Sequence, residues 1–450
     1  MPTTTWGYRA AIRFGSTLAP ALGLLYPKIR AGDQGRREAG DRLLEWARWN
    51  RDPRRPLAWF HAASVGEGLQ AEIVIRDLRH LRPDCQVIYT HFSPSAEELA
   101  RRLEVDAAEY LPYDLQPAID RLLAGLEPDL LVFSKLDVWP ELATRAATTG
   151  TQVAIVAGTV SPGSGRLRWP ARILLEPGYQ AVTAAAAISA EDAERLVRLG
   201  VPEDRICVLG DPRFDSVAER VSAVAVDEPL LQFGRGAPTM VAGSTWPPDE
   251  AVLLGAFARL RRRRPDARLI VVPHEPTTRH LDALERRAKA AGLPEPVRLS
   301  KAPGPVPLLV VDRTGALAAL YGAGAMGYVG GGFGRAGLHS VLEPAAWTIP
   351  VAFGPRWHDS RDAALLLHSG AAVALPPMPM GRAVRALETL WGNWLDDEAG
   401  RQAQGQRARE VVERGLGASQ RSAEMLTQLI SSRPLRRSPI AARSALRSAQ

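Results

Sequence analysis

The chain has 450 residues, of which 46% are hydrophobic and 23% charged, and a net charge of +7. This length favours two domains or more. Because the chain has only two cysteines, Cys85 and Cys207, a disulfide scaffold is excluded and a reducing, cytoplasmic compartment is favoured. The last twenty residues contain five arginines and no acid, so the net charge of the remaining chain is only about 7 − 5 = +2. Nucleic acid is not expected as a partner, because the sequence has no basic patch interleaved with aromatic residues.

The N-terminal segment predicts a helical membrane anchor over residues 1–50. Residues 14–26 are apolar, carry cations on both sides and lead into an amphipathic helix. Because a spanning helix needs roughly 20 apolar residues, we expect this segment to lie in the membrane interface rather than to cross the bilayer. A plain docking helix is the alternative, and a signal peptide is disfavoured because no clear cleavage site follows.

Short apolar runs alternate with helical segments from residue 57 onward. The pattern weakens across residues 216–236 and then restarts with "TMVAGS" and "RLIVVPH". Apolar strands with helices between them predict an α/β fold with two doubly wound parallel sheets. We assign residues 51–222 and 223–430 to the two domains and residues 431–450 to a disordered basic tail. The closing helical stretch has no strand after it and could pack across both domains.

The stretch "HAASVGEGLQAE" follows the first of these strands and opens a helix near Gly66. Glu67 therefore lies in the first turn, between Gly66 and Gly68, whose missing side chains would let a substrate approach. A carboxylate in this position can serve as a general base. The alternative is an ordinary first-turn acid that interacts with the helix dipole.

A glycine-rich stretch, "GGGFGRAGLHSVLEP", follows a later strand and contains the spacing Gly332-x-Gly334-x-x-Gly337. A dinucleotide fingerprint belongs to the first strand of its unit, whereas this stretch follows about the fourth strand of its domain. We expect its backbone N–H groups to face a phosphate, with Glu343 reaching a ribose or sugar hydroxyl.

Several stretches together resemble the 3-deoxy-D-manno-octulosonic acid (Kdo) transferases of lipopolysaccharide biosynthesis. They are "HAASVGE", "YLPYDL", the Trp-Pro of "LDVWPEL", "GDPRFD" and "GGGFGRAGLHSVLEPAAWTIPVAFGP", in matching order across residues 59–373. The resemblance implies a GT-B fold and inverting transfer of Kdo from CMP-Kdo to a lipid A precursor. It also implies that the enzyme works on the cytoplasmic face of the inner membrane and that the reaction needs no metal or cofactor. A sugar-nucleotide 2-epimerase on the same double fold is the alternative, and a catalytically silent binding protein is the third.

The resemblance also implies roles for individual residues. Glu67 falls on the catalytic base, and Asp137 is the next catalytic candidate. The acceptor-binding candidates are Gly66, Gly68, Lys135 and Trp139. The donor-binding candidates are Arg213, Ser244, Thr245, His274, Gly331, Gly332, Gly334, Gly337, His339, Ser340 and Glu343.

Four stretches depart from the family pattern, and one of them is Ala157-Gly158-Thr159, which stands where Asn-x-Arg is usual. Lys135-Leu136-Asp137 stands where Glu-Thr-Glu is usual, Pro273-His274-Glu275 replaces Pro-Arg-His, and Leu338-His339-Ser340 replaces Gly-His-Asn. These changes put the acceptor in doubt more than the fold or the donor class.

Some candidates have structural alternatives. Trp139 is at least as well explained as a packing residue at a helix start. Ser244 and Thr245 fit a helix N-cap as well as a phosphate contact. His61 and His91 are expected to be strand-end histidines satisfied by their neighbours.

Overall fold

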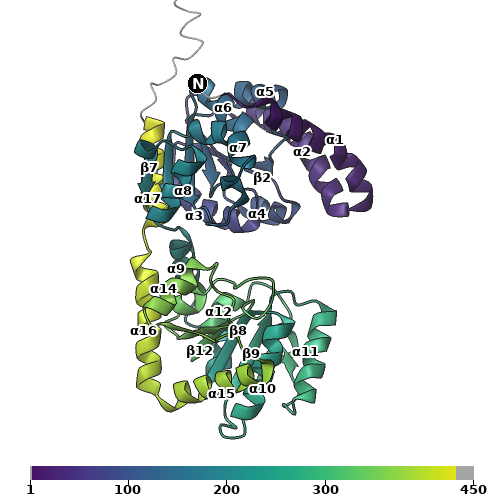
Figure 1. Ribbon diagram of the computed structural model, residues 1–450, viewed down its shortest axis with the longest axis vertical. Helices are drawn as coiled ribbons and strands as arrows, with labels where there is room; N and C mark the ends of the chain where they lie inside the picture. The colour runs from purple at the N-terminus through teal and green to yellow at the C-terminus, as the bar shows by residue number, and fades with distance from the viewer. Residues whose placement is uncertain (1–2, 432–450) are drawn as a thin grey trace, which may run out of the picture. The chain divides into compact units, whose positions relative to one another are not determined.

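The computed structural model describes residues 3–431, which form two compact units (Figure 1). The first comprises the residues up to Ser216 and those from Leu416 onward, and the second comprises Val217–Gly415. Each unit contains one parallel seven-stranded sheet, which confirms the predicted α/β fold of GT-B type. The basic tail expected after residue 431 lies outside the described residues.

The sheet of the first unit has the strand order β3-β2-β1-β4-β5-β6-β7. Its strands are β1 (Leu57–His61), β2 (Gln86–His91), β3 (Ala107–Tyr110), β4 (Leu130–Ser134), β5 (Gln152–Gly158), β6 (Ala184–Ala187) and β7 (Ile206–Val208). Its helices are α1 (Trp6–Leu25), α2 (Pro27–Asn50), α3 (Val65–Leu81), α4 (Glu97–Arg102), α5 (Gln116–Leu126), α6 (Pro140–Thr148), α7 (Ala171–Gln180), α8 (Ala190–Leu199) and α17 (Ala418–Ser431).

Both faces of this sheet are buried. Leu57 and Trp59 of β1 pack into a cluster with α2, α5 and α6, while Ala58 and Phe60 pack on the other face with α3 and α17. Because successive side chains of a strand point to opposite faces, a strand covered on both sides must be apolar throughout. This explains the continuous apolar runs.

The sheet of the second unit has the order β10-β11-β9-β8-β12-β13-β14. Its strands are β8 (Thr239–Thr245), β9 (Arg268–Pro273), β10 (Val297–Arg298), β11 (Leu308–Val310), β12 (Met326–Val329), β13 (Val351–Phe353) and β14 (Ala372–Ala374). Its helices are α10 (Pro247–Leu260), α11 (Thr278–Ala290), α12 (Leu317–Tyr321), α13 (Leu342–Ala346), α14 (Arg361–His368), α15 (Met380–Asp396) and α16 (Glu398–Arg414). Helix α9 (Arg213–Ser222) contains the division between the two units.

The closing helices divide between the units. Helix α16 packs against α13 in the second unit, whereas α17 packs against α3 in the first. Ala423, Leu426 and Ile430 of α17 belong to the same core cluster as β1 and β2. The assignment of residues 223–430 to one domain is therefore wrong for α17, because its apolar face fills the core of the first unit.

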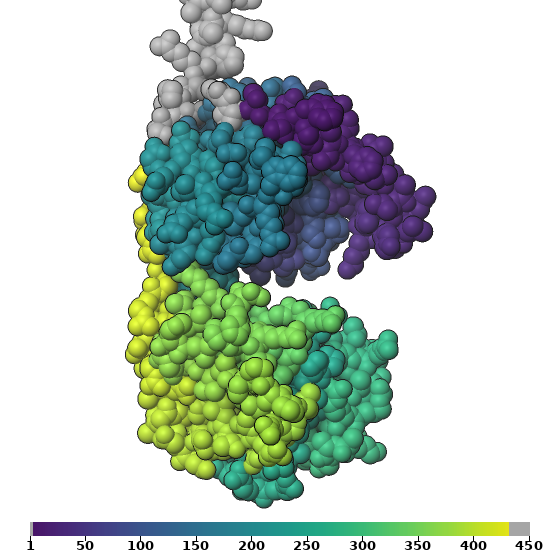
Figure 2. All heavy atoms as spheres, in the orientation of Figure 1, coloured from purple at the N-terminus to yellow at the C-terminus, as the bar shows by residue number. Residues whose placement is uncertain are grey.

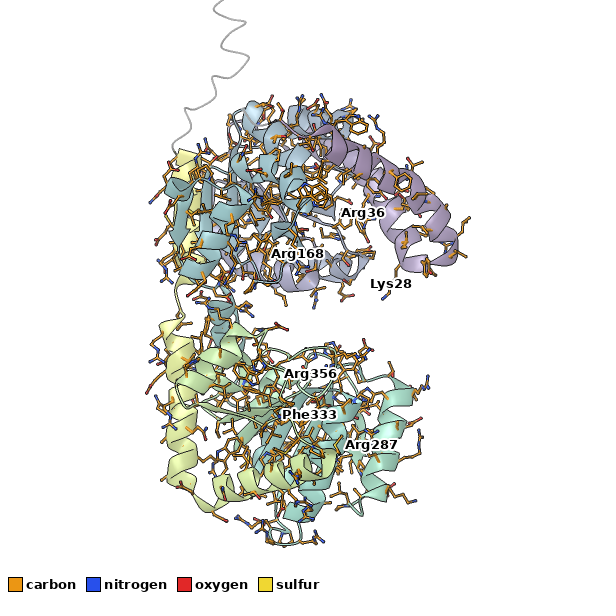
Figure 3. The ribbon with its side chains drawn as sticks, viewed as in Figure 1. Lys28, Arg36, Arg168, Arg287, Phe333 and Arg356 are labelled. Carbon is orange, nitrogen blue, oxygen red and sulfur yellow. The ribbon has the colours of Figure 1, made fainter. Side chains whose placement is uncertain are left out.

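Helices α1 and α2 form a hairpin that projects from the first unit, with Lys28 near its turn (Figures 2 and 3). The hairpin leaves large apolar side chains in solvent, with Trp6 84%, Phe14 67% and Leu24 84% exposed. Across residues 3–431, no helix combines the length and apolar character needed to cross a membrane.

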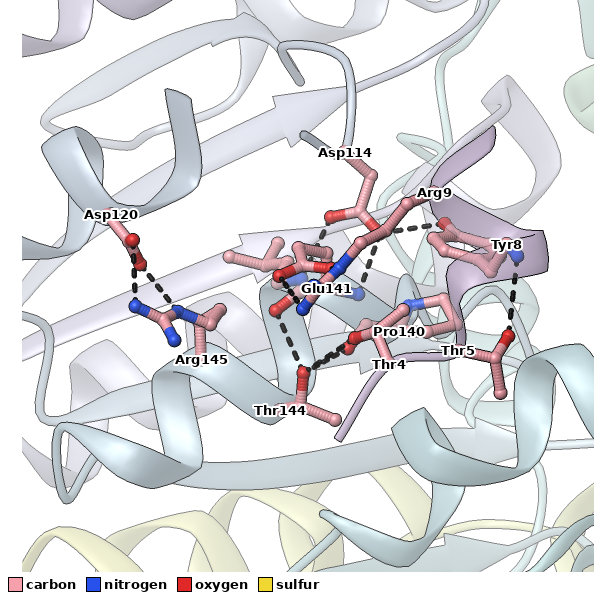
Figure 4. A network of polar contacts seen from close by, with 11 residues as sticks. Thr4, Thr5, Tyr8, Arg9, Asp114, Asp120, Pro140, Glu141, Thr144 and Arg145 are labelled. Atoms are coloured by element: carbon pink, nitrogen blue, oxygen red, sulfur yellow. Dashed lines mark hydrogen bonds and ion pairs between the residues drawn. The ribbon is translucent and has the colours of Figure 1, made fainter. Parts of the chain in front are cut away.

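A buried polar network fastens the start of α1 to α6 (Figure 4). The Tyr8 hydroxyl donates to Asp114 Oδ2 at 2.7 Å, and Arg9 forms two hydrogen bonds with the Glu141 carboxylate. Asp114 also accepts the backbone N–H groups of Glu141 and Leu142, both at 2.8 Å, and thus caps α6. Burial raises the pKa of Asp114 to about 6.

Replacing Tyr8 with Phe should destabilise the first unit by about 1.5–3 kcal/mol, the usual contribution of a hydrogen bond to a charged group. The reason is that Asp114 loses a donor where water cannot replace it. Denaturant unfolding followed by circular dichroism measures the change. Tyr26→Phe is the matched control because Tyr26 is 56% exposed. An equal, small effect of both substitutions would contradict the importance of this bond.

Candidate functional site

The loop after β1 places Glu67 where the first strand ends. Helix α3 begins at Val65, and Ser64 is its N-cap. The backbone N–H and the hydroxyl of Ser64 both donate to Glu67 Oε2 at 3.0 Å. The carboxylate is half-buried at the third position of the helix. The predicted first-turn position is confirmed, and the contact to Ser64 is that of a capping box.

The two glycines beside Glu67 differ in their surroundings. A Cβ atom added to Gly66 would have no neighbouring atom within 4 Å, which agrees with the expectation that a substrate can approach Gly66 closely. A Cβ atom on Gly68 would lie 2.5 Å from Leu99 Cδ2 and 2.7 Å from the Tyr89 hydroxyl. Gly68 therefore permits close packing of α3 and does not leave the expected open space, and its role as an acceptor contact stays a prediction.

The end of β4 lies beside this turn. The Ser134 hydroxyl donates to the Glu67 carbonyl at 3.0 Å, which joins β4 to α3. Lys135 follows with a φ of 63°, a left-handed conformation that non-glycine residues rarely adopt. Asp137 forms an ion pair with Arg166. Because this carboxylate already neutralises a cation, Asp137 is less suited than Glu67 to accept a proton.

Trp139 belongs to a packed polar chain. Its indole N–H donates to His61 Nε2 at 3.0 Å, and His61 Nδ1 lies 3.1 Å from Thr90 Oγ1. Since Nε2 accepts a bond, His61 is neutral and carries its proton on Nδ1. Burial lowers the pKa of His61 to about 4, in agreement. The indole N–H of Trp139 is thus used internally, which favours its packing role.

Arg213, predicted as a donor-contacting cation, lies in the first unit. Its guanidinium bonds to Asp211, with the shortest contact at 2.7 Å. The other predicted donor-binding residues lie in the second unit.

A glycine loop follows β12 in the second unit, and buried Asp249 holds it. Asp249 Oδ2 accepts the backbone N–H groups of Gly331 at 2.9 Å and Trp246 at 3.0 Å, while Oδ1 accepts the Tyr328 hydroxyl at 3.1 Å. Burial raises the pKa of Asp249. Asp249 was not predicted from the sequence, although its position in the first turn of the helix that follows "STWPP" can be seen there.

The glycines of this loop serve different purposes. Gly331 and Gly337 have φ values of 94° and 83°, which favour glycine. A Cβ atom on Gly332 would lie 2.7 Å from the backbone of Gly354, so Gly332 permits two loops to pack. Around Gly334 the nearest atom to an added Cβ is 3.8 Å away, which leaves room for a ligand. Phe333 and Arg356 lie at this loop (Figure 3).

Ser244 and Thr245 are not the N-cap of α10, because Trp246 occupies that position. Ser244 has a left-handed φ of 52°. The Thr245 hydroxyl donates to buried Glu250 at 3.1 Å. Glu250 also contacts His280 Nε2 at 2.8 Å. Thr245 thus uses its hydroxyl inside the unit.

Three aromatic rings gather where β8, β9 and β12 end. His274 and His339 stack with ring centroids 4.2 Å apart, and Trp246 lies 5.0 Å from His274. The Trp246 indole N–H donates to His339 Nε2 at 2.9 Å. Burial, then the neighbouring His274, lowers the pKa of His339 to about 4. The structure therefore brings His274 and His339 together beside the glycine loop, with Ser340 exposed next to them.

Glu343 lies in α13 and forms an ion pair with Arg220 at 3.3 Å. Burial raises the pKa of Glu343, and Arg220 opposes the shift. The carboxylate is 16% exposed, so a ligand hydroxyl would share it with Arg220. Within the described part of the chain, no group of three or more His, Cys, Asp or Glu side chains could hold a metal ion.

The two glycines allow a matched test. Gly68→Ala should lower the melting temperature, because the new methyl group must displace Leu99 or the Tyr89 hydroxyl, and overpacking typically costs about 1–3 kcal/mol. Gly66→Ala should leave the melting temperature nearly unchanged. Thermal unfolding of both variants measures the difference. A destabilised Gly66→Ala protein with an unaffected Gly68→Ala protein would reverse the assignment.

Comparison with known proteins adds family evidence to this geometry. Residues 38–216 match the family model described as 3-deoxy-D-manno-octulosonic-acid transferase (kdotransferase). The 3-deoxy-D-manno-octulosonic acid transferase of Bordetella pertussis is 29% identical over 82% of this chain and 87% of its own length. The transferase of the same name from Haemophilus influenzae is 24% identical over 82% and 86% of the two chains.

Among solved structures, the UDP-GlcNAc 2-epimerase of Neisseria meningitidis matches with a TM-score of 0.59 and 11% sequence identity, covering 84% of this chain and 100% of that chain. At this identity the likeness shows the fold alone. The family model over residues 38–216 and the curated relatives over 82% of the chain show that this chain is similar to Kdo transferases, as a divergent relative, and they support a glycosyltransferase.

Proposed function

We propose that the chain transfers Kdo from CMP-Kdo to a lipid A-type acceptor, with inversion at the anomeric carbon, on the cytoplasmic face of the inner membrane. The observation that carries the proposal is the Glu67 carboxylate, held half-buried at a helix start where β1 ends. The relatives named as Kdo transferases support the transferred sugar.

In this mechanism Glu67 takes the proton of the acceptor hydroxyl while the hydroxyl oxygen attacks the anomeric carbon. The bond from that carbon to the CMP phosphate oxygen breaks, and the phosphate leaves with the bonding electrons. Ser64 would orient the carboxylate through its two hydrogen bonds to Oε2. The proton ends on Glu67 and the negative charge on CMP.

The second unit offers the groups for a nucleotide donor. Backbone N–H groups of the glycine loop would stabilise the charge that grows on the leaving phosphate. Asp249 would keep that loop in place through its bond to the Gly331 N–H. The rings of His274 and His339 offer a flat surface beside the loop for a base or sugar. Arg213 is retained as a proposed donor contact.

Membrane contact is supported by two exposed apolar segments of the first unit. One is the outer face of α1, described above. The other is Arg168–Ile173, in which Trp169 is 79% and Ile173 47% exposed between exposed arginines. The two segments are neighbours, because a Cβ atom on Gly7 of α1 would lie 3.2 Å from Leu174 in α7. Aromatic and cationic side chains together suit an anionic lipid surface.

Glu67→Gln preserves the shape of the side chain and removes its basicity, so transfer should fall by roughly 100-fold or more. The purified protein is incubated with CMP-Kdo and lipid A precursor, and the glycosylated lipid is quantified by mass spectrometry. Glu98→Gln is the control, since Glu98 is another first-turn acid, in α4, and is exposed. Wild-type transfer by the Glu67→Gln protein would show that another group is the base. A product containing an epimerised sugar nucleotide and no glycolipid would favour the 2-epimerase alternative.

Trp169→Ser should weaken binding to anionic vesicles by about tenfold, because burying a large aromatic side chain contributes roughly 1.5–3 kcal/mol. Co-sedimentation of the full chain with vesicles gives the affinity. Trp49→Ser is the matched control, because Trp49 is 73% exposed but lies at the end of α2. Equal losses in both variants would remove Arg168–Ile173 from the membrane contact.

A further inference from the structure

A pocket of about 200 Å³ lies in the first unit between α2, α5 and the loop that follows β3. Three arginines line it, namely Arg36, Arg37 and Arg121, together with Asp41 and the ring of Tyr113. The rest of the lining is mainly apolar and includes Leu44 and Leu122. This volume is below the roughly 300–1,000 Å³ of pockets for drug-sized ligands, so it suits one headgroup rather than a whole glycolipid.

Two of the three arginines have carboxylate partners. Arg37 forms an ion pair with Asp33 at 3.0 Å, and Arg121 pairs with Asp41 at 2.8 Å. Asp33 additionally accepts the Tyr113 hydroxyl at 2.6 Å. Arg36 forms no ion pair with any carboxylate in the described part of the chain. The pocket therefore carries one unbalanced positive charge, and it lies on Arg36.

Arg36 is also the most buried of the three, with 9% of its surface exposed. Its direct contacts are neutral, since Nη2 donates to the Phe92 carbonyl at 2.8 Å and the guanidinium lies 3.7 Å above the Phe92 ring, while the Asp33 carboxylate is close enough for Arg36 to lower its pKa without forming an ion pair. Its Nε–H is buried and has no hydrogen-bond partner. A buried guanidinium with no direct ion pair and an unpartnered N–H is costly, so this arrangement points to an anion that completes it.

Arg36 is joined through Phe92 to the turn that holds Glu67, because the Phe92 N–H donates to the Ala63 carbonyl at 3.3 Å. Phe92, which follows β2, packs on Trp139 with ring centroids 4.9 Å apart, and Trp139 bonds to His61 at the end of β1. Arg36 thus lies against residues that follow β2 and β3, on the side of α2 that contacts Phe92 (Figure 3). A group bound there would belong to a molecule that also reaches this edge of the sheet.

We propose that the Arg36 pocket binds a phosphomonoester group of the amphiphilic acceptor. A guanidinium matches the oxygens of a phosphate through two parallel hydrogen bonds, and the apolar lining suits the uncharged part of the same molecule. The identity of the ligand rests on the proposed function, whereas the phosphate site itself does not.

Thermal unfolding of the full chain with increasing inorganic phosphate tests the site directly. Phosphate should raise the melting temperature of the wild type in a concentration-dependent way. Arg36→Met should lose this response, with at least a tenfold weaker affinity, because it removes the buried charge. Without phosphate its melting temperature should stay near that of the wild type, since an unpaired charge is removed. Arg198→Gln, an exposed arginine of α8, is the control and should respond as the wild type does.

Vesicles distinguish the source of the phosphate. The probes are phosphatidylcholine vesicles with and without phosphatidic acid, whose headgroup is a phosphomonoester. Binding to the phosphatidic acid vesicles that depends on Arg36 would assign the site to a membrane headgroup. A response to inorganic phosphate alone would assign the site to a soluble phosphate and would contradict the acceptor as its ligand. An equal phosphate response in Arg36→Met, or no Arg36-dependent binding of either probe, would overturn the site.

Two further measurements complete the test. If Arg36→Met does not fold, Arg121→Gln is used, because the Arg121 side chain is 67% exposed and also lines the pocket. In the transfer assay, Arg36→Met should raise the KM for a phosphorylated acceptor about tenfold with little change in kcat. A wild-type protein that binds phosphate but transfers no Kdo would contradict the proposed function and leave the phosphate site standing.

Discussion

Each sheet is buried on both faces, and this constraint decides where the polar side chains of the strands and their connecting loops can lie. Strands such as β1 and β4 are buried along their whole length and carry almost no polar side chains. Polar side chains that belong to the sheets therefore gather where strands end and helices begin. Glu67, Ser134 and Lys135 lie at the ends of β1 and β4, and His274 and the glycine loop lie at the ends of β9 and β12.

Two buried acids, one in each unit, hold these ends in place. Asp114 binds two backbone N–H groups at the start of α6 and the hydroxyl of Tyr8, and Asp249 joins the start of α10 to the glycine loop. The folded pKa of Asp114, about 6, exceeds its ordinary value of 3.8. Its contribution to stability is therefore fully present below pH 3.8 and is lost as the pH rises through about 6. Near neutral pH, burial of the ionised Asp114 carboxylate therefore lowers the stability of the folded state, while its hydrogen bonds fix the start of α6.

The features that depend on local pattern could be predicted from the sequence. Continuous apolar runs with helices between them indicated two parallel sheets, and the residues around Glu67 indicated the start of a helix. The features that depend on distant partners could not. Gly68 was read as an opening because Leu99 and Tyr89, which fill the space beside it, come from other elements.

Other errors and omissions have the same origin. Asp249 was not singled out, because its contact with Gly331 joins residues 82 positions apart in the sequence. The N–H of Trp139 could not be assigned to His61 without the register of β1, and the unpaired charge of Arg36 appears only once the partners of Arg37 and Arg121 are known. Helix α17 has the composition of any amphipathic helix, so its place on the first unit depends on the tertiary core.

The position of α17 has a consequence for biosynthesis. The first unit is discontinuous along the chain, because its core needs Ala423, Leu426 and Ile430, which are synthesised after the whole second unit. While the ribosome makes residues 217–415, the apolar surface of α3 that these side chains cover is still open. The nascent first unit stays incompletely covered until α17 has been synthesised, and this is the period in which chaperones would bind it.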